Sequence, residues 1–485
     1  MPALSPRRAL AVLGLAAWAL ALLPYIFTSN FTDDEFTCLN HALRLLAGQV
    51  PYRDFFEFVP PLSYMLAAGL FAATGPSLLA AHAVVVAALA LAAWQLADLA
   101  RRAGATWWLA VQPGLLLCFG LYRHFPAYSH HWLAVPAVLA AMQGAQRERW
   151  LAAGAAAGLA GLMLQTDGAA AWLVVAIAAL WSGRRALAAV AAGALLPLGP
   201  VVAYLAAHQA LGAAIQDLWS WPRANYRIPG GINDVPYGSD FFRELLLAPE
   251  GPLLALNMVY MALLYLLPPA MAVTALVLLA RGDQQRRVLA LAALALGAVA
   301  VTGRTDVVHI AAYAYPALLL AATFPRAGAA LLPGMSAATC ALFLAMVVGR
   351  PGTWLSLRSP DARLAQSDVI RFIQQHSAPG DTILGMPWGG FFYFYGRPAA
   401  SRFTLLLHPR EGYAREPQVA EAYEEIRARR PKLVLLAPEM RGHAHFQLYD
   451  HFLYPLPGYR LLGEADMPHD HNGGYPVLIF GRDKP

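Results

Sequence analysis

Charged side chains are scarce in this sequence. Of its 485 residues, 13% are Asp, Glu, Lys or Arg, while 58% are hydrophobic. A soluble globular domain usually carries about 25% charged residues. The composition therefore excludes an ordinary soluble protein and predicts a chain that crosses a membrane several times.

Cysteine is also rare. The three cysteines, Cys38, Cys118 and Cys340, are far apart. Their spacing gives no disulfide framework and no set of zinc ligands. A basic stripe with interleaved aromatic residues is missing as well, so nucleic acid is not expected as a partner.

What the chain does have is a series of long apolar runs, separated by short loops with paired arginines. A membrane helix needs about 20 apolar residues, and cytoplasmic loops are enriched in Lys and Arg. Arg7 and Arg8 ahead of the first run predict a retained helix with a cytoplasmic N-terminus, and not a cleaved signal peptide. Together the rules predict about eleven transmembrane helices, at 9–28, 77–100, 106–121, 131–145, 150–165, 169–182, 186–208, 252–280, 288–302, 309–324 and 328–348.

The last part of the chain, 349–485, has a different pattern. Helix-like stretches such as SDVIRFIQQH alternate with strand-like stretches such as DTILGMP, SRFTLLL, KLVLLAP and YPVLIFG. Such alternation predicts a small α/β domain, which the topology places outside the cytoplasm. We therefore expect a polytopic α-helical membrane domain over 1–348 and an extracytoplasmic domain over 349–485, in a bacterial inner membrane.

In this topology the unusual ionisable residues collect on the outer face. Such groups cost a few kcal/mol at membrane depth unless they pair or line a wet cavity, so we expect one cavity at the outer helix ends. The residues are Asp33, Asp34, Glu35, Asp54, Glu57, Arg123, His124, His130, His131, Asp167, Arg304, Asp306 and His309.

The first outer loop, about 29–76, opens with the acids of FTDDEF. In EFTCLNHALRLLAG the apolar residues recur every three or four positions, which predicts an amphipathic helix on the membrane that ends at Gly48. Asp33 or Asp34 would then lie at the helix N-terminus, where an acid is favoured by the dipole without any catalytic role.

The stretch TDDEF…LNHALRLLAGQVPYRDFF…PPLSYML resembles the first outer loop of membrane-embedded C-type (GT-C) glycosyltransferases, such as the protein O-mannosyltransferases and the lipid A aminoarabinose transferase. Their Asp-Glu pair corresponds to Asp34 and Glu35, and their Gly-x-x-Pro-Tyr-x-Asp stretch to 48–54. GRTDVVHIAAYAYP resembles a late helix where basic residues meet the lipid phosphate, and PWGGFFYFYGRPAASRFTLLL resembles an outer-domain segment. The chain departs from the family at LQTDG, where members often carry a lysine.

The resemblance implies transfer of a sugar from a polyprenyl-phosphate donor to an acceptor outside the cytoplasm, with inversion. It implies Asp34 as the catalytic base, with Asp33 and Glu35 as the alternative candidates for this role. Donor or substrate contacts are expected at Arg304, His309, Arg123, His124, Asp167, Tyr52 and Asp54. No cofactor or metal site is required, although three neighbouring acids could hold a divalent cation. The expected partners are the lipid bilayer, the lipid-linked sugar and an unidentified glycan, lipid or protein acceptor.

Other interpretations stay open. The chain could be a transporter or flippase, although we find no internal repeat and the ionisable residues avoid the midplane. It could be another lipid-linked glycan enzyme, such as a ligase or polymerase, or a scaffold whose acids only cap a helix. Arg304 and Asp306 could form a simple loop ion pair, FFYFYG could serve packing, and WSWPRANYRIPGG, at 219–231, could be a lid over the acceptor.

Overall fold

The computed structural model describes Trp18, 20–27, 33–226, 234–238, 252–349, 359–386, 389–404, Glu421, Glu424, Glu425, 427–436, 458–468 and 475–482. The chain forms two compact units. The first combines Met1–Thr28, His82–Val201 and Val235–Leu357, and the second combines Ser29–Ala81, Val202–Asp234 and Arg358–Pro485. Each unit is therefore assembled from three separate segments.

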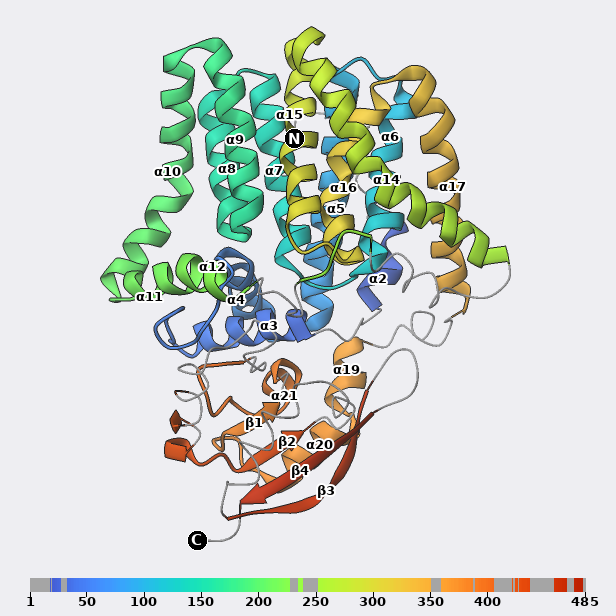
Figure 1. Ribbon diagram of the computed structural model, residues 1–485. Helices are drawn as coiled ribbons and strands as arrows, with labels where there is room; N and C mark the ends of the chain where they lie inside the picture. The colour runs from blue at the N-terminus through green and yellow to red at the C-terminus, as the bar shows by residue number, and fades with distance from the viewer. Residues whose placement is uncertain are drawn as a thin grey trace, which may run out of the picture. The chain divides into compact units, whose positions relative to one another are not determined.

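Apolar helices that run side by side make up the first unit (Figure 1). A short helix, α2 (Leu23–Phe27), precedes them. The longer elements are α5 (Leu78–Arg102), α6 (Trp107–Leu115) with its π-helical continuation η1 (Leu116–Leu121), η2 (Tyr122–His124), α7 (His130–Gln146), α8 (Trp150–Met163), α9 (Gln165–Ser182), α10 (Arg184–Ala207), α14 (Pro252–Arg281), α15 (Gln284–Thr302), α16 (Val307–Ala322) and α17 (Pro325–Gly349).

Five helices in the described part are long and apolar enough to cross a membrane, namely α5, α10, α14, α15 and α17. They coincide with the spans predicted at 77–100, 186–208, 252–280, 288–302 and 328–348. The segments predicted at 150–165 and 309–324 form the shorter apolar helices α8 and α16. Most of the first predicted span lies outside the described residues. The chain is thus a multi-pass helical membrane protein, while the count of eleven helices stays a prediction.

Small residues let α8, α9 and α10 approach closely. A β-carbon on Gly168 would lie 2.1 Å from Cα of Gly161, and one on Gly154 would lie 2.1 Å from the carbonyl oxygen of Val190. Because lipid provides no hydrophobic force between helices, membrane helices associate largely through such close contacts. Glycine is required at both positions.

In the second unit, the acids of FTDDEF begin a long amphipathic helix. This helix, α3 (Asp33–Leu46), confirms the helix predicted from the three-to-four-residue spacing. Gly48 follows it with a φ of +80°, a value that glycine adopts without strain. The other helical elements are α4 (Leu62–Thr74), α11 (Leu211–Ile215), η3 (Gln216–Ser220), α12 (Trp221–Asn225), α19 (Pro360–Ala365), α20 (Asp368–His376) and α21 (Gly390–Tyr395).

A four-stranded sheet completes this unit. Its strands are β1 (Ile383–Met386), β2 (Leu433–Leu436), β3 (Tyr459–Met467) and β4 (Tyr475–Arg482), in the order β1-β2-β4-β3. β1 and β2 are parallel, whereas β4 runs antiparallel to both of its neighbours. β2 is buried throughout, which fits its uninterrupted apolar sequence. The helix and strands predicted from SDVIRFIQQH, DTILGMP, KLVLLAP and YPVLIFG are confirmed.

The strand predicted at SRFTLLL is wrong for its described residues, 401–404, which form bends and loop. Ser401 Oγ accepts a hydrogen bond from the Phe403 N–H at 3.0 Å, and Glu425 accepts from the Arg402 N–H at 2.7 Å. These side chains occupy N–H groups that a strand would use for its ladder.

The aromatic run FFYFYG forms α21 and packs on α3. The Phe391 and Phe36 ring centroids are 5.2 Å apart, and those of Phe394 and Phe36 are 6.0 Å apart. Gly390 faces the α3 backbone so closely that a β-carbon would lie 2.6 Å from the Thr37 nitrogen. The run therefore serves packing within the second unit.

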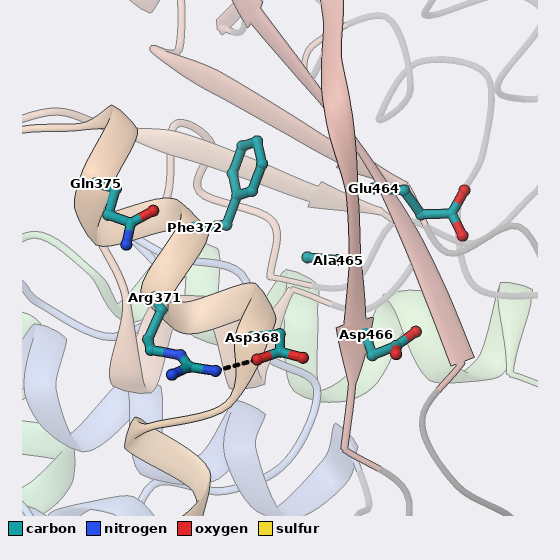
Figure 2. Close-up of a pocket in the computed structure, with 7 residues that line it drawn as sticks. All are labelled: Asp368, Arg371, Phe372, Gln375, Glu464, Ala465 and Asp466. Carbon is teal, nitrogen blue, oxygen red and sulfur yellow. Dashed lines mark hydrogen bonds and ion pairs between the residues drawn. The ribbon is translucent and has the colours of Figure 1, made fainter.

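A surface pocket of about 440 Å³ lies between α20 and β3 (Figure 2). Asp368 and Arg371, which form an ion pair, line it together with Phe372, Glu464 and Asp466. The three carboxylates are exposed to solvent. None of the predicted site residues lines this pocket.

Candidate functional site

The first turn of α3 carries the predicted base. Asp34 is exposed, whereas Glu35 is completely buried, and the side chain of Asp33 lies outside the described residues. Burial raises the pKa of the Cys38 thiol, a hydrogen bond to Ser63 opposes this shift, and the negative charges of Glu57, Glu35 and Asp34 add to it. The three carboxylates therefore lie near one buried thiol, and among them Asp34 is accessible to a substrate.

A chain of buried hydrogen bonds connects Glu57, His41 and Thr404. Nδ1 of His41 lies 3.1 Å from Oε2 of Glu57, and Nε2 lies 3.2 Å from the Thr404 hydroxyl. The other Glu57 oxygen accepts the N–H groups of Phe58 and Val59 at 2.8 and 3.0 Å. Burial lowers the pKa of His41, which favours the neutral ring. His41 then donates from Nδ1 to Glu57 and accepts the Thr404 proton at Nε2.

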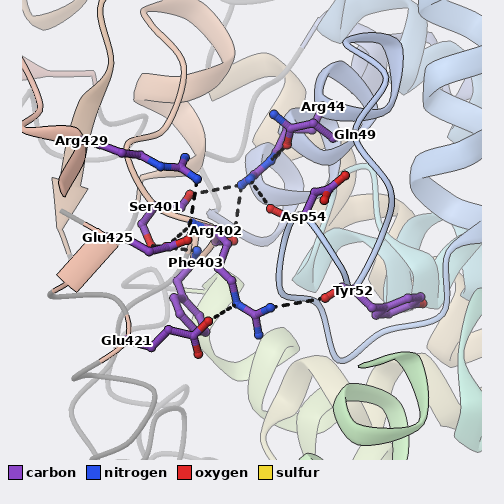
Figure 3. Close-up of polar contacts among 10 residues, drawn as sticks. All are labelled: Arg44, Gln49, Tyr52, Asp54, Ser401, Arg402, Phe403, Glu421, Glu425 and Arg429. Carbon is purple, nitrogen blue, oxygen red and sulfur yellow. Dashed lines mark hydrogen bonds and ion pairs between the residues drawn. The ribbon is translucent and has the colours of Figure 1, made fainter. Parts of the chain in front are cut away.

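The predicted substrate contacts Tyr52 and Asp54 belong to a tightly held loop (Figure 3). Tyr52 is buried with a φ of +67°, and its hydroxyl donates to the Val59 carbonyl at 3.1 Å. Asp54 Oδ2 accepts the Val50 N–H at 2.7 Å, and the hydrogen bond from Arg53 lowers the pKa of Asp54. Both side chains thus have structural partners, and their assignment to donor binding stays a prediction.

Two arginines tie this loop to the C-terminal segment. Arg44 donates to the Asp54 carbonyl at 2.9 Å and to the Ser401 carbonyl at 3.4 Å. Arg402 donates to the Tyr52 carbonyl at 3.4 Å, and its Nε lies 3.1 Å from Glu421 (Figure 3). A guanidinium suits this task because its several donors keep a fixed planar geometry.

A second polar cluster surrounds the start of α16 in the first unit. Asp306 caps the helix, since its Oδ1 accepts the His309 N–H at 3.0 Å and lies 2.8 Å from His309 Nδ1. Its other oxygen pairs with Arg304. Burial opposes ionisation of Asp306, but His309 and Arg304 outweigh it and hold the pKa below its usual range. One carboxylate therefore orients both predicted phosphate contacts.

His131, which was not among the predicted contacts, belongs to this second cluster. Its ring meets that of His309 edge to face, with centroids 5.2 Å apart, and lies 4.4 Å from the ring of His130. Tyr313 joins the group through its ring, 6.3 Å from His131, and a hydrogen bond connects it to Asp167. The adjacent histidines at the start of α7 did not predict the contact between His131 and His309, because His309 lies on α16, far along the chain.

Arg123 and His124 are held by α14. Arg123 donates to Asn257, and its guanidinium lies 4.8 Å from the centroid of Tyr260. His124 stacks on the same ring, with a centroid distance of 5.8 Å. Two groups of predicted phosphate contacts result. Arg304 and His309 share the carboxylate of Asp306, and Arg123 and His124 share the ring of Tyr260.

The acidic and the basic candidates belong to different units. The carboxylates Asp34, Glu35 and Glu57 belong to the second unit, and the predicted phosphate contacts belong to the first, namely Arg304, His309, Arg123 and His124. Within the described residues, no group of three or more His, Cys, Asp or Glu side chains could hold a metal ion.

No family model and no curated protein sequence matches this chain. Among solved structures, it is similar to ArnT from Cupriavidus metallidurans bound to undecaprenyl phosphate, with 15% identity and a TM-score of 0.49 over 98% of this chain and 99% of that chain. It is similar to arabinofuranosyltransferase AftD from Mycobacteria, with 15% identity and a TM-score of 0.49 over 100% of this chain and 40% of that one.

A third similarity is to the S. cerevisiae protein O-mannosyltransferase Pmt1-Pmt2 complex bound to the sugar donor. It has 16% identity and a TM-score of 0.34 over 44% of this chain and 36% of that one. Because all these TM-scores are below 0.5, a function for this chain has to be derived from its own residues.

Proposed function

We propose that this chain is an integral-membrane glycosyltransferase that moves a sugar from a polyprenyl-phosphate donor to an acceptor on the outer face of the membrane, with inversion. The observation that carries the proposal is an exposed carboxylate, Asp34, on the first turn of a rigidly packed helix in a multi-pass membrane protein. The expected setting is a bacterial inner membrane, with a cytoplasmic N-terminus and an extracytoplasmic C-terminal segment.

In the proposed reaction the acceptor oxygen attacks C1 of the sugar. The bond between C1 and the phosphate oxygen breaks, its electron pair goes to the phosphate, and the acceptor proton goes to Asp34. A carboxylate can act as this base if it reaches the acceptor hydroxyl. The exposure of Asp34 and the burial of Glu35 favour Asp34 among the described acids.

The leaving phosphate needs positive charge where its negative charge develops. Arg304 and His309 supply the groups for this role, and Asp306 orients both of them. Arg123 and His124 are the second choice. The proposal assigns the acceptor proton to an acid of the second unit and the leaving phosphate to the basic cluster of the first unit.

The proposal also fits the family resemblance of the first outer loop. That resemblance implies a polyprenyl-phosphate sugar, which is therefore the donor to test first. The sugar could be a hexose or a pentose.

The deciding experiment uses the purified full chain, reconstituted in liposomes with a radiolabelled undecaprenyl-phosphate sugar and an envelope extract from cells that lack the protein. A glycosyltransferase converts the label into a covalent product in the extract. Movement of the label across the membrane without any covalent product would instead support the transporter or flippase. Mass spectrometry of envelope glycolipids and glycoproteins from cells with and without the protein identifies the acceptor.

A further inference from the structure

The chain turns where the apolar helix α10 ends. Gln209 has a φ of +56°, and its N–H donates to the Ala206 carbonyl at 3.1 Å. The Ala210 N–H donates to the Leu205 carbonyl at 2.8 Å. These two hydrogen bonds form a Schellman motif, which stops a helix and redirects the chain. Because α10 is long and apolar enough to cross a membrane and α11 begins at Leu211, α11 starts within about 15 Å of the end of that helix.

The helical segment after this turn has a buried face. α11, η3 and α12 follow one another without a break and form one helical stretch, which we call the 211–225 helix. Trp221 and Asn225, four positions apart, are both buried. Trp221 packs on Phe56 and Phe58 with centroid distances of 5.2 and 5.0 Å. This face of the helix is therefore held by the second unit.

Another face of the 211–225 helix exposes large apolar side chains. Ile215 is 56% exposed and Trp219 is 63% exposed. They are four positions apart and hence neighbours on the helix surface. The guanidinium of Arg223, also exposed, lies 5.1 Å from the centroid of the Trp219 ring. Neighbouring large apolar side chains on one exposed face mark an interaction surface.

The helix α10 exposes side chains of the same kind just before the turn. Leu195, Leu196 and Val202 are 65%, 60% and 46% exposed. On a helix that can cross a membrane, such residues face lipid. The series of exposed apolar residues therefore continues along the chain from a lipid-facing helix to Ile215 and Trp219.

The charge of the exposed face indicates what covers it. The charged residues of the 211–225 helix are Asp217, which is buried, and Arg223, which is exposed. Tryptophan is enriched at membrane–water interfaces, and arginine lays its apolar stem on a hydrophobic surface while its charged end stays in contact with water and phosphate. Anionic headgroups attract such an arginine. An apolar protein surface would instead bury the guanidinium.

We infer that the exposed face of the 211–225 helix docks on the surface of the lipid bilayer. Ile215 and Trp219 enter the headgroup layer, as in other amphipathic helices that lie in the membrane interface. Arg223 contacts the phosphates of anionic phospholipids. The inference goes beyond the proposed function, because it requires no transfer reaction. It gives a membrane-anchoring role to 219–226, the described part of the predicted lid.

The test places an environment-sensitive fluorophore on the full chain in nanodiscs. The background carries Cys340→Ser, since Cys38 and Cys118 are buried. The label is attached at Ile215→Cys or, as a matched control, at Leu461→Cys, a site on β3 in the same unit that is 55% exposed. Quenching is measured with phospholipids that carry a nitroxide at the top of an acyl chain, and with iodide in water.

The lipid nitroxide should remove most of the fluorescence at position 215 and little at position 461, and iodide should give the reverse order. Trp219→Cys is the second site on the same face, and it decides if the first variant does not fold. Equal quenching at the two positions, or strong quenching by iodide at 215, would overturn the inference. A label at 215 that neither quencher reaches would overturn it too, because a protein segment or a second copy of the chain would then cover the face.

Arg223 allows a separate test of headgroup charge. Phosphatidylglycerol with the nitroxide should be enriched about fivefold over phosphatidylcholine beside the label at 215, the contribution of one arginine near an anionic surface. Arg223→Gln should remove this preference while quenching by lipid persists. Arg371→Gln, at an exposed arginine on α20, is the control and should keep it. An unchanged preference in Arg223→Gln would refute the phosphate contact. Because none of these measurements involves sugar transfer, their outcome is independent of the proposed function.

Discussion

Glu57 Oε2 and His41 Nδ1 lie 3.1 Å apart in the interior of the second unit. His41 belongs to α3, and Glu57 to the loop that follows it. The same ring contacts Thr404, 363 positions along the chain. One neutral imidazole thus joins the first loop to the C-terminal segment and holds a carboxylate near the predicted base.

Replacing His41 by Phe should destabilise the protein by about 2 kcal/mol, because hydrogen bonds to charged groups contribute about 1.5–3 kcal/mol. The ring volume stays, but Glu57 and Thr404 lose a partner. Thermal unfolding in detergent measures the change. The exposed pair Asp368 and Arg371 provides the control, since Arg371→Gln should change stability by no more than about 0.5 kcal/mol. Equal effects of the two substitutions would contradict a structural role for His41.

Asp34→Asn should abolish sugar transfer, with a loss of about 100-fold or more, the usual contribution of a general base. The amide keeps the size of the side chain but cannot take the proton. Binding of undecaprenyl phosphate should stay near normal, which separates chemistry from donor binding. Wild-type turnover in this variant would move the base to Asp33 or Glu35, which are then substituted in the same assay.

Arg304→Ala should weaken binding of undecaprenyl phosphate by about tenfold, because a charge-assisted hydrogen bond to phosphate contributes more than 1 kcal/mol. The measurement is tryptophan fluorescence during titration with the lipid. Arg123→Ala, which removes a guanidinium bound to Asn257, is the matched comparison. A larger loss for Arg123→Ala than for Arg304→Ala would place the phosphate near α14.

Because of Asp306, the stability of the first unit should depend on pH in the acidic range. His309 and Arg304 keep its pKa below the ordinary value despite burial. A carboxyl with a lowered folded-state pKa stabilises the fold above its ordinary pKa of about 4 and loses that contribution as the pH falls further. Asp306→Asn should lower the unfolding temperature at pH 7 and show less additional loss between pH 4 and pH 2.5. A parallel loss in both proteins would show that other carboxyl groups dominate.

Gly390→Ala should destabilise the second unit without touching any charged group. The new methyl group would lie 2.6 Å from the Thr37 nitrogen and 2.8 Å from the Phe36 carbonyl carbon, so α21 has to move away from α3. Overpacking of this kind typically costs about 1–3 kcal/mol. Gly380→Ala is the control, because a β-carbon there meets no atom within 4 Å. Identical unfolding temperatures for the two variants would disprove the close approach.

Features that depend on neighbouring residues were predictable from the sequence. The apolar runs predicted the positions of α5, α10, α14, α15 and α17, because spanning length and hydropathy are local properties. The spacing in EFTCLNHALRLLAG predicted α3 for the same reason. The pairing of Arg304 with Asp306 was also foreseen, since the two residues are two positions apart.

The partners of distant residues were not predictable. His131 meets His309 across the helix bundle, and Asp217 receives a hydrogen bond from Glu57, 160 positions earlier. Residues so far apart share no local pattern, such as the spacing of positions along one helix. A single sequence therefore contains no signal that they lie close together. The roles of Tyr52 and Asp54 as parts of a packed loop became visible only with the arginines that hold them.

Sequence alone determined that this chain resides in a membrane and that its first loop forms an amphipathic helix, because a bilayer and a helix both act on short windows of residues. Only the tertiary structure decided which carboxylate is exposed and which is buried, as Asp34 and Glu35 show. Burial and pairing arise when remote segments of the chain pack together. Because 58% of the residues are hydrophobic, the composition is compatible with many alternative packings and does not select one of them.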